Sequence, residues 1–307
     1  MIQEAKTKKL KWLLVSSPTK KNLAYLWDNF PVSNEDLAIT LPPLQRPRVV
    51  PYKDYTLVIL QMPYYDKTSR EIRSSELDMF IGRDYVITVT DGKLSALNLL
   101  FDYAQDHPEK ITKEYKDDPG LLVHSILNEL LMYQFPMLNR ISQDLDAIEN
   151  VILEDAPTHK DAIQNILTIK RNIANFRRIS QTHRHIIQKI SEVDQHFTKS
   201  ESNSTRLQDL MGHTYETWTT LEGYRETVNA LHETHESLLN FRTNQVIKTL
   251  TVFSVIVFPL TLLAAIFGMN TAYMPLVNDV SGFWIILGVM FVGALVMYFY
   301  FKHRKWI

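Results

Sequence analysis

Leu250–Phe267 reads LTVFSVIVFPLTLLAAIF, and this stretch of eighteen residues carries no charged side chain. A second uncharged run of nineteen residues, FWIILGVMFVGALVMYFYF, follows at Phe283–Phe301. At about 1.5 Å per residue, a helix of either length crosses the roughly 30 Å hydrocarbon core of a bilayer. Pro259 interrupts the first run, but membrane helices tolerate proline where neighbouring groups satisfy the freed carbonyl. We therefore expect two C-terminal transmembrane helices, and not two buried helices of a soluble protein.

The rest of the chain has the composition of a water-soluble protein. Of 34 acidic and 33 basic residues, only Asp279, Lys302, Arg304 and Lys305 lie after residue 249. A net charge of −1 gives no basic excess of the kind that binds nucleic acid. The absence of cysteine excludes disulfides and thiol nucleophiles. We expect no enzyme activity and no cofactor, because the sequence has no glycine-rich phosphate loop, nucleophile elbow or HExxH motif.

The basic residues around the two apolar runs predict their orientation. Arg242 and Lys248 precede the first run and the basic tail follows the second, whereas the hairpin of residues 271–282 contains no Lys or Arg. Because positive charge is enriched on the cytoplasmic side, we expect both termini in the cytosol and the hairpin outside. The chain would then be a multi-pass protein of the plasma or inner membrane.

Residues 1–118 mix short strand-like runs with helical segments. TLVILQM at Thr56–Met62 and DYVITVTDG at Asp84–Gly92 read as strands, and KLSALNLLFDYAQ at residues 93–105 reads as an amphipathic helix. We predict an α+β cytoplasmic domain in which helices flank one mixed sheet.

Residues 119–249 read as a helical stalk, and residues 250–307 as the membrane domain. Apolar residues recur at three and four from Leu121 to about Asp155 and from Lys160 to about Val193. A third helix begins near Leu207 and meets no proline before Pro259, so it would run for roughly sixty residues from the cytosol into the membrane. A helix of this length needs partners, which predicts an oligomer.

A polar stripe follows the third helix into the membrane. Its members recur with the three-and-four spacing of residues that face a common axis, and several are small or hydroxylated: Asn244, Ile247, Thr251, Ser254, Phe258 and Thr261. Polar groups on one shared face favour a protein-lined or water-lined surface. Alternatively, the Thr and Ser hydroxyls bond to carbonyls of their own helix and assist helix packing.

Asn270 stands at the outer end of this stripe. Several copies around an axis would present a ring of neutral carbonyl acceptors, which could hold a hydrated magnesium ion through its waters without stripping them. A ring of carboxylates would bind the ion harder and release it more slowly, whereas conduction needs weak binding. The alternative is that Asn270 is a helix C-terminal residue in the left-handed conformation.

The motif Gly268-Met269-Asn270, followed by Tyr273-Met274-Pro275, resembles the CorA family of divalent-cation channels. The two C-terminal apolar runs and the tail KHRKW fit that family, and QRPRV at Gln45–Val49 and the segment IKRNIANFRR have counterparts in it. The resemblance implies a funnel-shaped homopentamer that passes Mg²⁺, and in many members Co²⁺ or Ni²⁺, down its electrochemical gradient.

The resemblance also assigns roles along the first transmembrane helix. Gly268, Met269 and Asn270 would form the selectivity filter, where Asn270 meets the metal ion. Asn244 would form a cytosolic polar ring, and Ile247 with Leu250 a hydrophobic gate. The residues that would line the path between are Thr251, Ser254, Phe258 and Thr261.

The chain also departs from the family pattern. Phe267 replaces a tyrosine, Thr271 replaces an aromatic residue, and Leu276 replaces an acidic residue, which leaves Asp279 as the only carboxylate of the hairpin. Asp209 matches one member of the carboxylate pair with which some relatives sense Mg²⁺ between subunits. The other position falls at Ile39, with Glu35 and Asp36 a helical turn away, so the pair is incomplete.

Two other functions are compatible with the same topology. A zinc transporter would fit the His-containing pairs His183/His185 and His232/His235, although relatives that carry zinc typically replace the methionine that this chain keeps as Met269. A membrane-anchored scaffold would use the two helices only as a tether, and it would pass no ions.

Overall fold

The computed structural model describes residues 2–7, 9–153, 159–193, 197–198, 203–270, 281–304 and 306. It divides into two compact units, Met1–Leu231 and His232–Ile307. The three-part division into residues 1–118, 119–249 and 250–307 stays a prediction.

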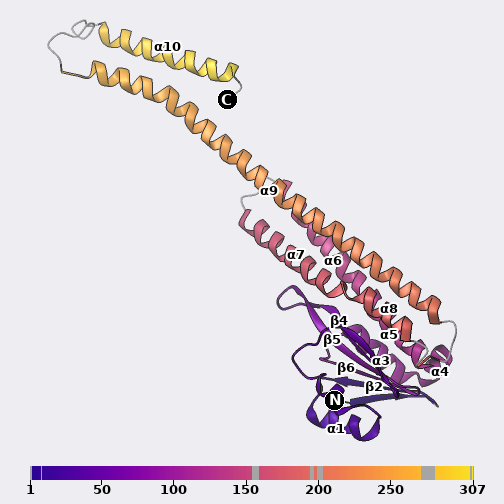
Figure 1. The fold of residues 1–307 in the computed structure, drawn as a ribbon. Helices are drawn as coiled ribbons and strands as arrows, with labels where there is room; N and C mark the ends of the chain where they lie inside the picture. Colours follow the sequence, from indigo (N-terminus) through magenta and orange to yellow (C-terminus); the bar gives the residue numbers. More distant parts are fainter. Residues whose placement is uncertain are drawn as a thin grey trace. The chain divides into compact units, whose positions relative to one another are not determined.

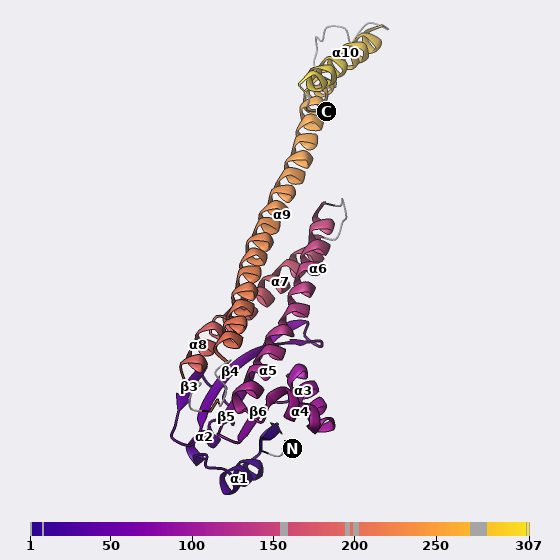
Figure 2. The ribbon, with the colours of Figure 1, turned by 90° about the vertical axis from the view of Figure 1, so that its right-hand side faces the viewer.

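The first unit contains one six-stranded sheet in the order β1-β2-β6-β5-β4-β3. Figure 1 labels β2, β4, β5 and β6 of this sheet, and β3 is labelled in Figure 2. The parallel pair is β2 with β6, and the other neighbours are antiparallel. The predicted mixed sheet is therefore confirmed. Its strands are β1 (Ile2–Lys6), β2 (Lys11–Ser16), β3 (Arg48–Pro51), β4 (Thr56–Asp66), β5 (Glu71–Ile81) and β6 (Tyr85–Thr90).

Helices cover both faces of this sheet, as the sequence predicts. Alternate strand residues face opposite sides, so Leu13 packs on one face and Leu14 on the other. The first face carries α1 (Lys20–Asn29) and α2 (Asn34–Ala38). The second face carries the core formed with α3 (Ser95–Asp106), α5 (Pro119–Met132), α8 (His183–Val193) and the start of α9 (Asn203–Phe267).

The helical region contains more helices than the periodicity indicates. The segment expected as one helix from Leu121 is divided into α5 and α6 (Gln134–Leu153) at Tyr133. Pro136 explains the break, because it has no N–H to donate to the carbonyl of Met132 in a continuous helix. The next segment is likewise divided into α7 (His159–Ser180) and α8, and the remaining short helix is α4 (Pro108–Tyr115).

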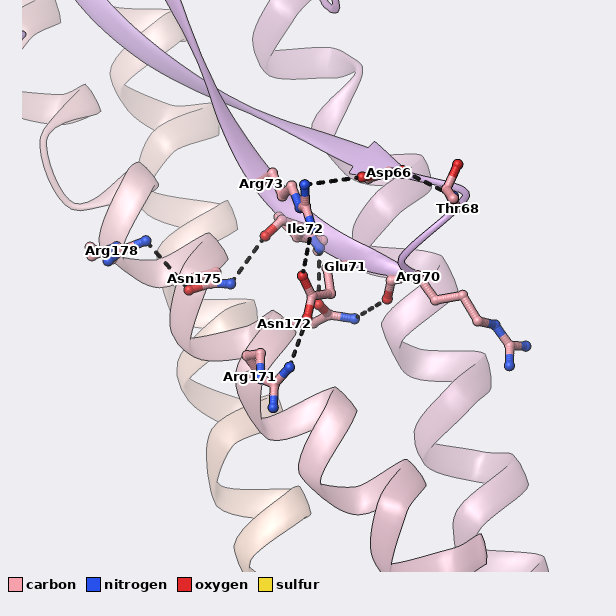
Figure 3. A network of polar contacts seen from close by, with 10 residues as sticks. All are labelled: Asp66, Thr68, Arg70, Glu71, Ile72, Arg73, Arg171, Asn172, Asn175 and Arg178. Atoms are coloured by element: carbon pink, nitrogen blue, oxygen red, sulfur yellow. Dashed lines mark hydrogen bonds and ion pairs between the residues drawn. The ribbon is translucent and has the colours of Figure 1, made fainter. Parts of the chain in front are cut away.

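Two asparagines of α7 bind the free edge of β5 (Figure 3). Strand β6 pairs with β5 only from Leu77 onward, so the first half of β5 lacks a neighbour on that side. The amide of Asn172 accepts from Ile72 N–H at 2.9 Å and donates to Arg70 O at 3.0 Å. Asn175 donates to Ile72 O at 3.2 Å. These bonds replace a strand partner and attach α7 to the sheet.

His183 is buried where α8 begins. Its side chain is 1% exposed, and Nε2 lies 2.8 Å from the Gln61 carbonyl, which can accept a hydrogen bond from the neutral ring. Burial lowers the pKa of His183 to about 4, against the partial opposing effect of that hydrogen bond. The imidazole is therefore neutral at physiological pH.

Two carboxyl groups of β5 are also buried. Desolvation, followed by the charge of Glu76, raises the pKa of Asp78 to about 8. Desolvation also raises the pKa of Glu76, although that side chain accepts a hydrogen bond from Gln45 N–H. The sequence reading did not identify this pair.

Helix α9 confirms the long third helix expected from the sequence, since it continues through Pro259. Within the second unit, α10 (Gly282–His303) follows α9 after the segment 271–280. Both helices are long and apolar enough to cross a membrane, and only 6% of the most apolar window of each is buried. A core helix of a soluble protein would be mostly buried instead.

Candidate functional site

The candidate site is the surface of α9 from Asn244 to its C-terminal end. At 3.6 residues per turn, the predicted stripe and Leu250 fall within an arc of about 120° on the helix. This surface is open in the single chain, where Ile247 is 55%, Leu250 63% and Phe258 71% exposed. By contrast, Val252 on the other side of the helix is 5% exposed. The stripe is therefore largely exposed in the single chain, as are most other positions of this part of α9, such as Val246 and Phe253.

The hydroxyl groups of the stripe all bond to their own helix. Thr251 donates to Ile247 O at 2.8 Å, Ser254 to Leu250 O at 2.9 Å and Thr261 to Val257 O at 2.9 Å. This geometry agrees with the alternative hypothesis for the stripe, in which the hydroxyl groups bond to backbone carbonyls of their own helix. It leaves the oxygen atoms on the helix surface as acceptors, so it is compatible with a wet face as well.

The segment after α9 leaves the helix in a tight turn. Gly268 N–H donates to Ala264 O at 2.9 Å, and Met269 N–H donates to Ile266 O at 3.2 Å. A Cβ atom on Gly268 would lie 3.1 Å from the Ala264 carbonyl oxygen, which is closer than ordinary packing allows. Glycine therefore lets the chain turn against the last carbonyls of the helix.

Asn270 is exposed at the end of this turn. The described residues with positive φ do not include Asn270, so the left-handed cap considered from the sequence is not the conformation found. Its carboxamide has no hydrogen-bond partner among the described residues. The tip of the hairpin, including Thr271, Tyr273, Leu276 and Asp279, lies outside the described residues, as does Lys305 of the tail.

An apolar cavity of about 350 Å³ lies between the two candidate membrane helices near this turn. Phe267 and Gly268 contribute from the α9 side, and Phe283 and Met290 from α10. The turn that carries Asn270 therefore sits beside apolar surface on the α10 side, while the stripe of α9 remains uncovered.

The possible Mg²⁺-sensing residues occupy different surroundings. Asp209 is exposed on α9 and lines a shallow hollow with His124, His213 and Glu216. Ile39 caps α2 and packs against the apolar core. Asp36 accepts hydrogen bonds from the hydroxyls of Tyr52 and Tyr55. Its carboxylate therefore has a structural role and is not free to bind Mg²⁺.

Among the described residues, neither histidine pair is part of a metal site. The ring of His183 is buried against the Gln61 carbonyl, and His232 lies 3.4 Å from Glu236. The part of the chain that the structure describes contains no group of three or more His, Asp or Glu side chains placed to hold a metal ion. A zinc site would therefore need ligands from more than one chain or from outside the described ranges.

An α+β domain followed by a long helix and a second apolar helix, both long and apolar enough to cross a membrane, is the architecture of a membrane protein with a large soluble domain. The family model described as CorA-like Mg²⁺ transporter protein matches residues 7–303. The chain therefore belongs to the CorA-like Mg²⁺ transporter family, and the family resemblance stated from the sequence is confirmed. The chain is a divalent-cation transporter, and the members of its family are transport proteins and not enzymes.

Known proteins match the chain over most of its length. The chain is 28% identical over 266 residues to the cobalt/magnesium transport protein CorA of Thermotoga maritima, a match that covers 86% of this chain and 73% of that protein. The complete CorA magnesium transporter structure from Methanocaldococcus jannaschii superimposes with a TM-score of 0.83 at 22% identity, covering 97% and 92% of the two chains. This likeness confirms the predicted fold class of a soluble α+β domain, a long helix and two C-terminal apolar helices.

A further solved structure shares the fold of the soluble region. The ZntB cytoplasmic domain from Vibrio parahaemolyticus superimposes with a TM-score of 0.56 at 16% identity, covering 76% of this chain and 89% of that one. At this identity the likeness shows a common fold alone. It does not favour zinc over magnesium.

Proposed function

We propose that this protein is a channel for hydrated divalent cations, with Mg²⁺ as the principal ion and Co²⁺ or Ni²⁺ as further substrates. The observation that carries the proposal is the uncovered face of α9, which ends at the exposed carboxamide of Asn270. Copies of this face around an axis form a path lined by oxygen acceptors and interrupted by Ile247 and Leu250. Such apolar rings close a pore by dewetting.

In this proposal the chain forms a homopentamer in the plasma or inner membrane, with both termini in the cytosol. Residues 1–118 and 119–249 form the cytoplasmic body and stalk, and residues 250–307 form the pore domain. Gly268, Met269 and Asn270 of each copy form the selectivity filter, at which Mg²⁺ binds through its waters. The name of the Thermotoga maritima relative, a cobalt/magnesium transport protein, supports this choice of ions.

Ion flux into proteoliposomes tests the proposed filter. We expect Asn270→Ala to reduce Mg²⁺ flux about tenfold or more, because the variant loses the acceptors that hold the hydrated ion. Thr249→Val is the matched control, since Thr249 bonds to Gln245 O as the stripe hydroxyls bond to their carbonyls but lies on the opposite side of α9. Equal flux through wild type and Asn270→Ala would refute the filter.

The same assay separates the channel from its two alternatives. A zinc transporter would pass Zn²⁺ in preference to Mg²⁺, and a scaffold would pass neither ion. We expect Mg²⁺, Co²⁺ and Ni²⁺ to pass and to compete with one another.

A further inference from the structure

The two candidate membrane helices share a strongly basic end, opposite the hairpin that joins them. After Glu236 the next acidic residue of the sequence is Asp279, and none follows it. The two segments that flank the apolar runs at this end, residues 237–249 and 302–307, therefore contain no carboxylate side chain. Their basic residues include four that the structure describes, which we call the basic end: Arg242, Lys248, Lys302 and Arg304.

The basic end begins at the same depth on both helices. At 1.5 Å per residue, Lys248 lies about 29 Å before the end of α9 at Phe267. Lys302 likewise lies about 30 Å beyond the start of α10 at Gly282. The hydrocarbon core of a bilayer is about 30 Å thick. If the hairpin lies at one surface of the bilayer, both helices bring their first basic residue to the headgroups of the other surface.

The last turn of α10 holds aromatic and basic side chains together. Arg304 N–H donates to Tyr300 O at 3.0 Å, and the guanidinium carbon lies 5.8 Å from the centre of the Tyr300 ring. Trp306 N–H donates to Phe301 O at 2.9 Å, and the rings of these two residues are 5.7 Å apart. Tyr and Trp rings are favoured at the level of the headgroups. The tail is therefore folded back on the helix with rings and charges suited to that level.

The basic side chains of α10 are accessible to an external anion. Lys302 and Arg304 are both exposed. Within the described part of the chain, no carboxylate lies within ion-pair distance of either side chain. Their charges are therefore not neutralised inside the chain.

The position of the basic end favours lipid phosphate as the anion that neutralises it. Lys302 directly follows the apolar run, where a bilayer presents headgroup phosphates at high local concentration. Clusters of basic residues next to a membrane helix attract anionic lipids for this reason. A dissolved phosphate ion has the same chemistry but does not accumulate at this depth.

We propose that the basic end binds the phosphate groups of anionic phospholipids in the adjoining leaflet. Lys302 and Arg304 donate to phosphate oxygens, and the two basic residues of α9 add to the attractive potential. The Trp306 ring lies at the headgroup level beside them. This surface is separate from the filter proposed above and does not depend on ion conduction.

Quenching of tryptophan fluorescence by brominated lipids measures this binding in the full-length protein. In a Trp284→Phe background, Trp306 is the remaining tryptophan beside an apolar run, because Trp12, Trp27 and Trp218 belong to the first unit. Bilayers that mix brominated phosphatidylglycerol with phosphatidylcholine, and the converse series, give the relative affinity of the two lipids around Trp306. We expect a preference for phosphatidylglycerol of about fivefold or more, which falls as salt is added.

Charge removal in the same background locates the preference. Lys302→Gln/Arg304→Gln removes two charges, and it should bring the affinity ratio close to one. Lys20→Gln/Lys21→Gln removes the same number of charges from exposed positions of α1, and this matched control should retain the preference. Inorganic phosphate should displace the lipid no more than chloride of equal ionic strength does.

Three results would overturn the proposal. Equal quenching by the two lipids in the unaltered tail is one, and it is also the result expected if an acidic protein surface covers the basic end. An unchanged preference in Lys302→Gln/Arg304→Gln is the second, and displacement by inorganic phosphate beyond the chloride control is the third. Asn270→Ala should keep the preference, so failure of the pore and failure of this surface give different results.

Discussion

His183 illustrates how single side chains depend on their burial in this protein. Its ring is enclosed where α8 meets the sheet, and the neutral form donates to the Gln61 carbonyl. A protonated ring would carry a charge into an apolar region. The folded chain therefore takes up this proton only at low pH.

We predict that His183 makes the folded state acid-sensitive. Its pKa is about 4 in the native protein and near 6.5 in the unfolded chain, so the unfolded chain binds more protons between these values. The contribution to stability is complete above pH 6.5 and is lost as the pH falls toward 4. The loss is on the order of 3 kcal/mol at most.

The measurement is the pH dependence of Tm for wild type and His183→Gln. Glutamine keeps an N–H donor for Gln61 but does not titrate in this range. We expect the Tm of wild type to fall more steeply with acid than that of the variant. Parallel curves would contradict the assignment of acid sensitivity to this ring.

The sequence predicted some residue environments well and missed others. The spacing of the stripe correctly placed Thr251, Ser254 and Thr261 on one face, since helical periodicity fixes relative angles. It did not identify Asp78 as buried, because an acidic residue in a strand normally points to water. Only the register of β5 between β4 and β6 reveals that this position faces inward.

At the scale of elements, α7 stabilises the free edge of β5 with side-chain amides. The hydrogen bonds of Asn172 and Asn175 have ordinary lengths and are buried or partly buried, whereas the ion pairs that Glu71 makes with Arg73 and Arg171 lie at the surface (Figure 3). Buried hydrogen bonds contribute more than exposed ion pairs. The amides are therefore the main polar attachment of α7 to the sheet.

We predict that Asn172→Ala destabilises the protein by about 1–3 kcal/mol, because it leaves the Ile72 N–H and the Arg70 carbonyl unpaired. Glu71→Gln, which removes only surface ion pairs, is the control and should change Tm little. Thermal unfolding in detergent measures both. A larger loss of Tm in Glu71→Gln than in Asn172→Ala would contradict this ranking.

The stripe on α9 predicts which positions meet in the oligomer. Because the chain contains no cysteine, single cysteines report proximity without background. We expect Thr251→Cys to form disulfide-linked dimers between copies under mild oxidation, since copies of this face would lie close around the axis. Thr249→Cys on the opposite side of α9 should cross-link far less. Equal cross-linking at the two positions would place the axis elsewhere.

Element boundaries were less predictable than element types. TLVILQM, DYVITVTDG and the helix after Lys93 are all present, because alternation and amphipathic spacing are strong local signals. The division of α5 from α6 was missed, although Pro136 was visible in the sequence as the residue without an N–H. Strand β5 was also missed, since its half-polar first part, EIRSSE, is stabilised by α7 and not by its own composition.

At the scale of the whole molecule, orientation in the membrane is the first property to test. We predict that a cysteine introduced at Asn278 in the hairpin is labelled by an impermeant maleimide added outside intact cells. A cysteine introduced at His303, after the second apolar helix, should be labelled only after the membrane is opened. The reverse pattern would place both termini outside.

The overall architecture could be predicted because it depends on long uniform signals. Two uncharged runs of helical length and an uninterrupted helix before them define the order of the parts, and family membership is confirmed over residues 7–303. Oligomer number and the axis of assembly could not be predicted in this way. They depend on how copies of α9 pack, which a single chain does not specify.

The hydroxyl groups of the stripe on α9 have a consequence for charge discrimination in the proposed pore, because each already donates its hydrogen bond to a carbonyl four residues earlier. Water molecules bound to a cation point their hydrogen atoms outward, and they can donate hydrogen bonds to the hydroxyl oxygens of such a wall. Water around chloride turns its oxygen outward and would need donors, which these side chains no longer offer. In the proposed pore, an electrically neutral wall of this kind is expected to disfavour anions through the orientation of the water in their hydration shells, without any acidic residue.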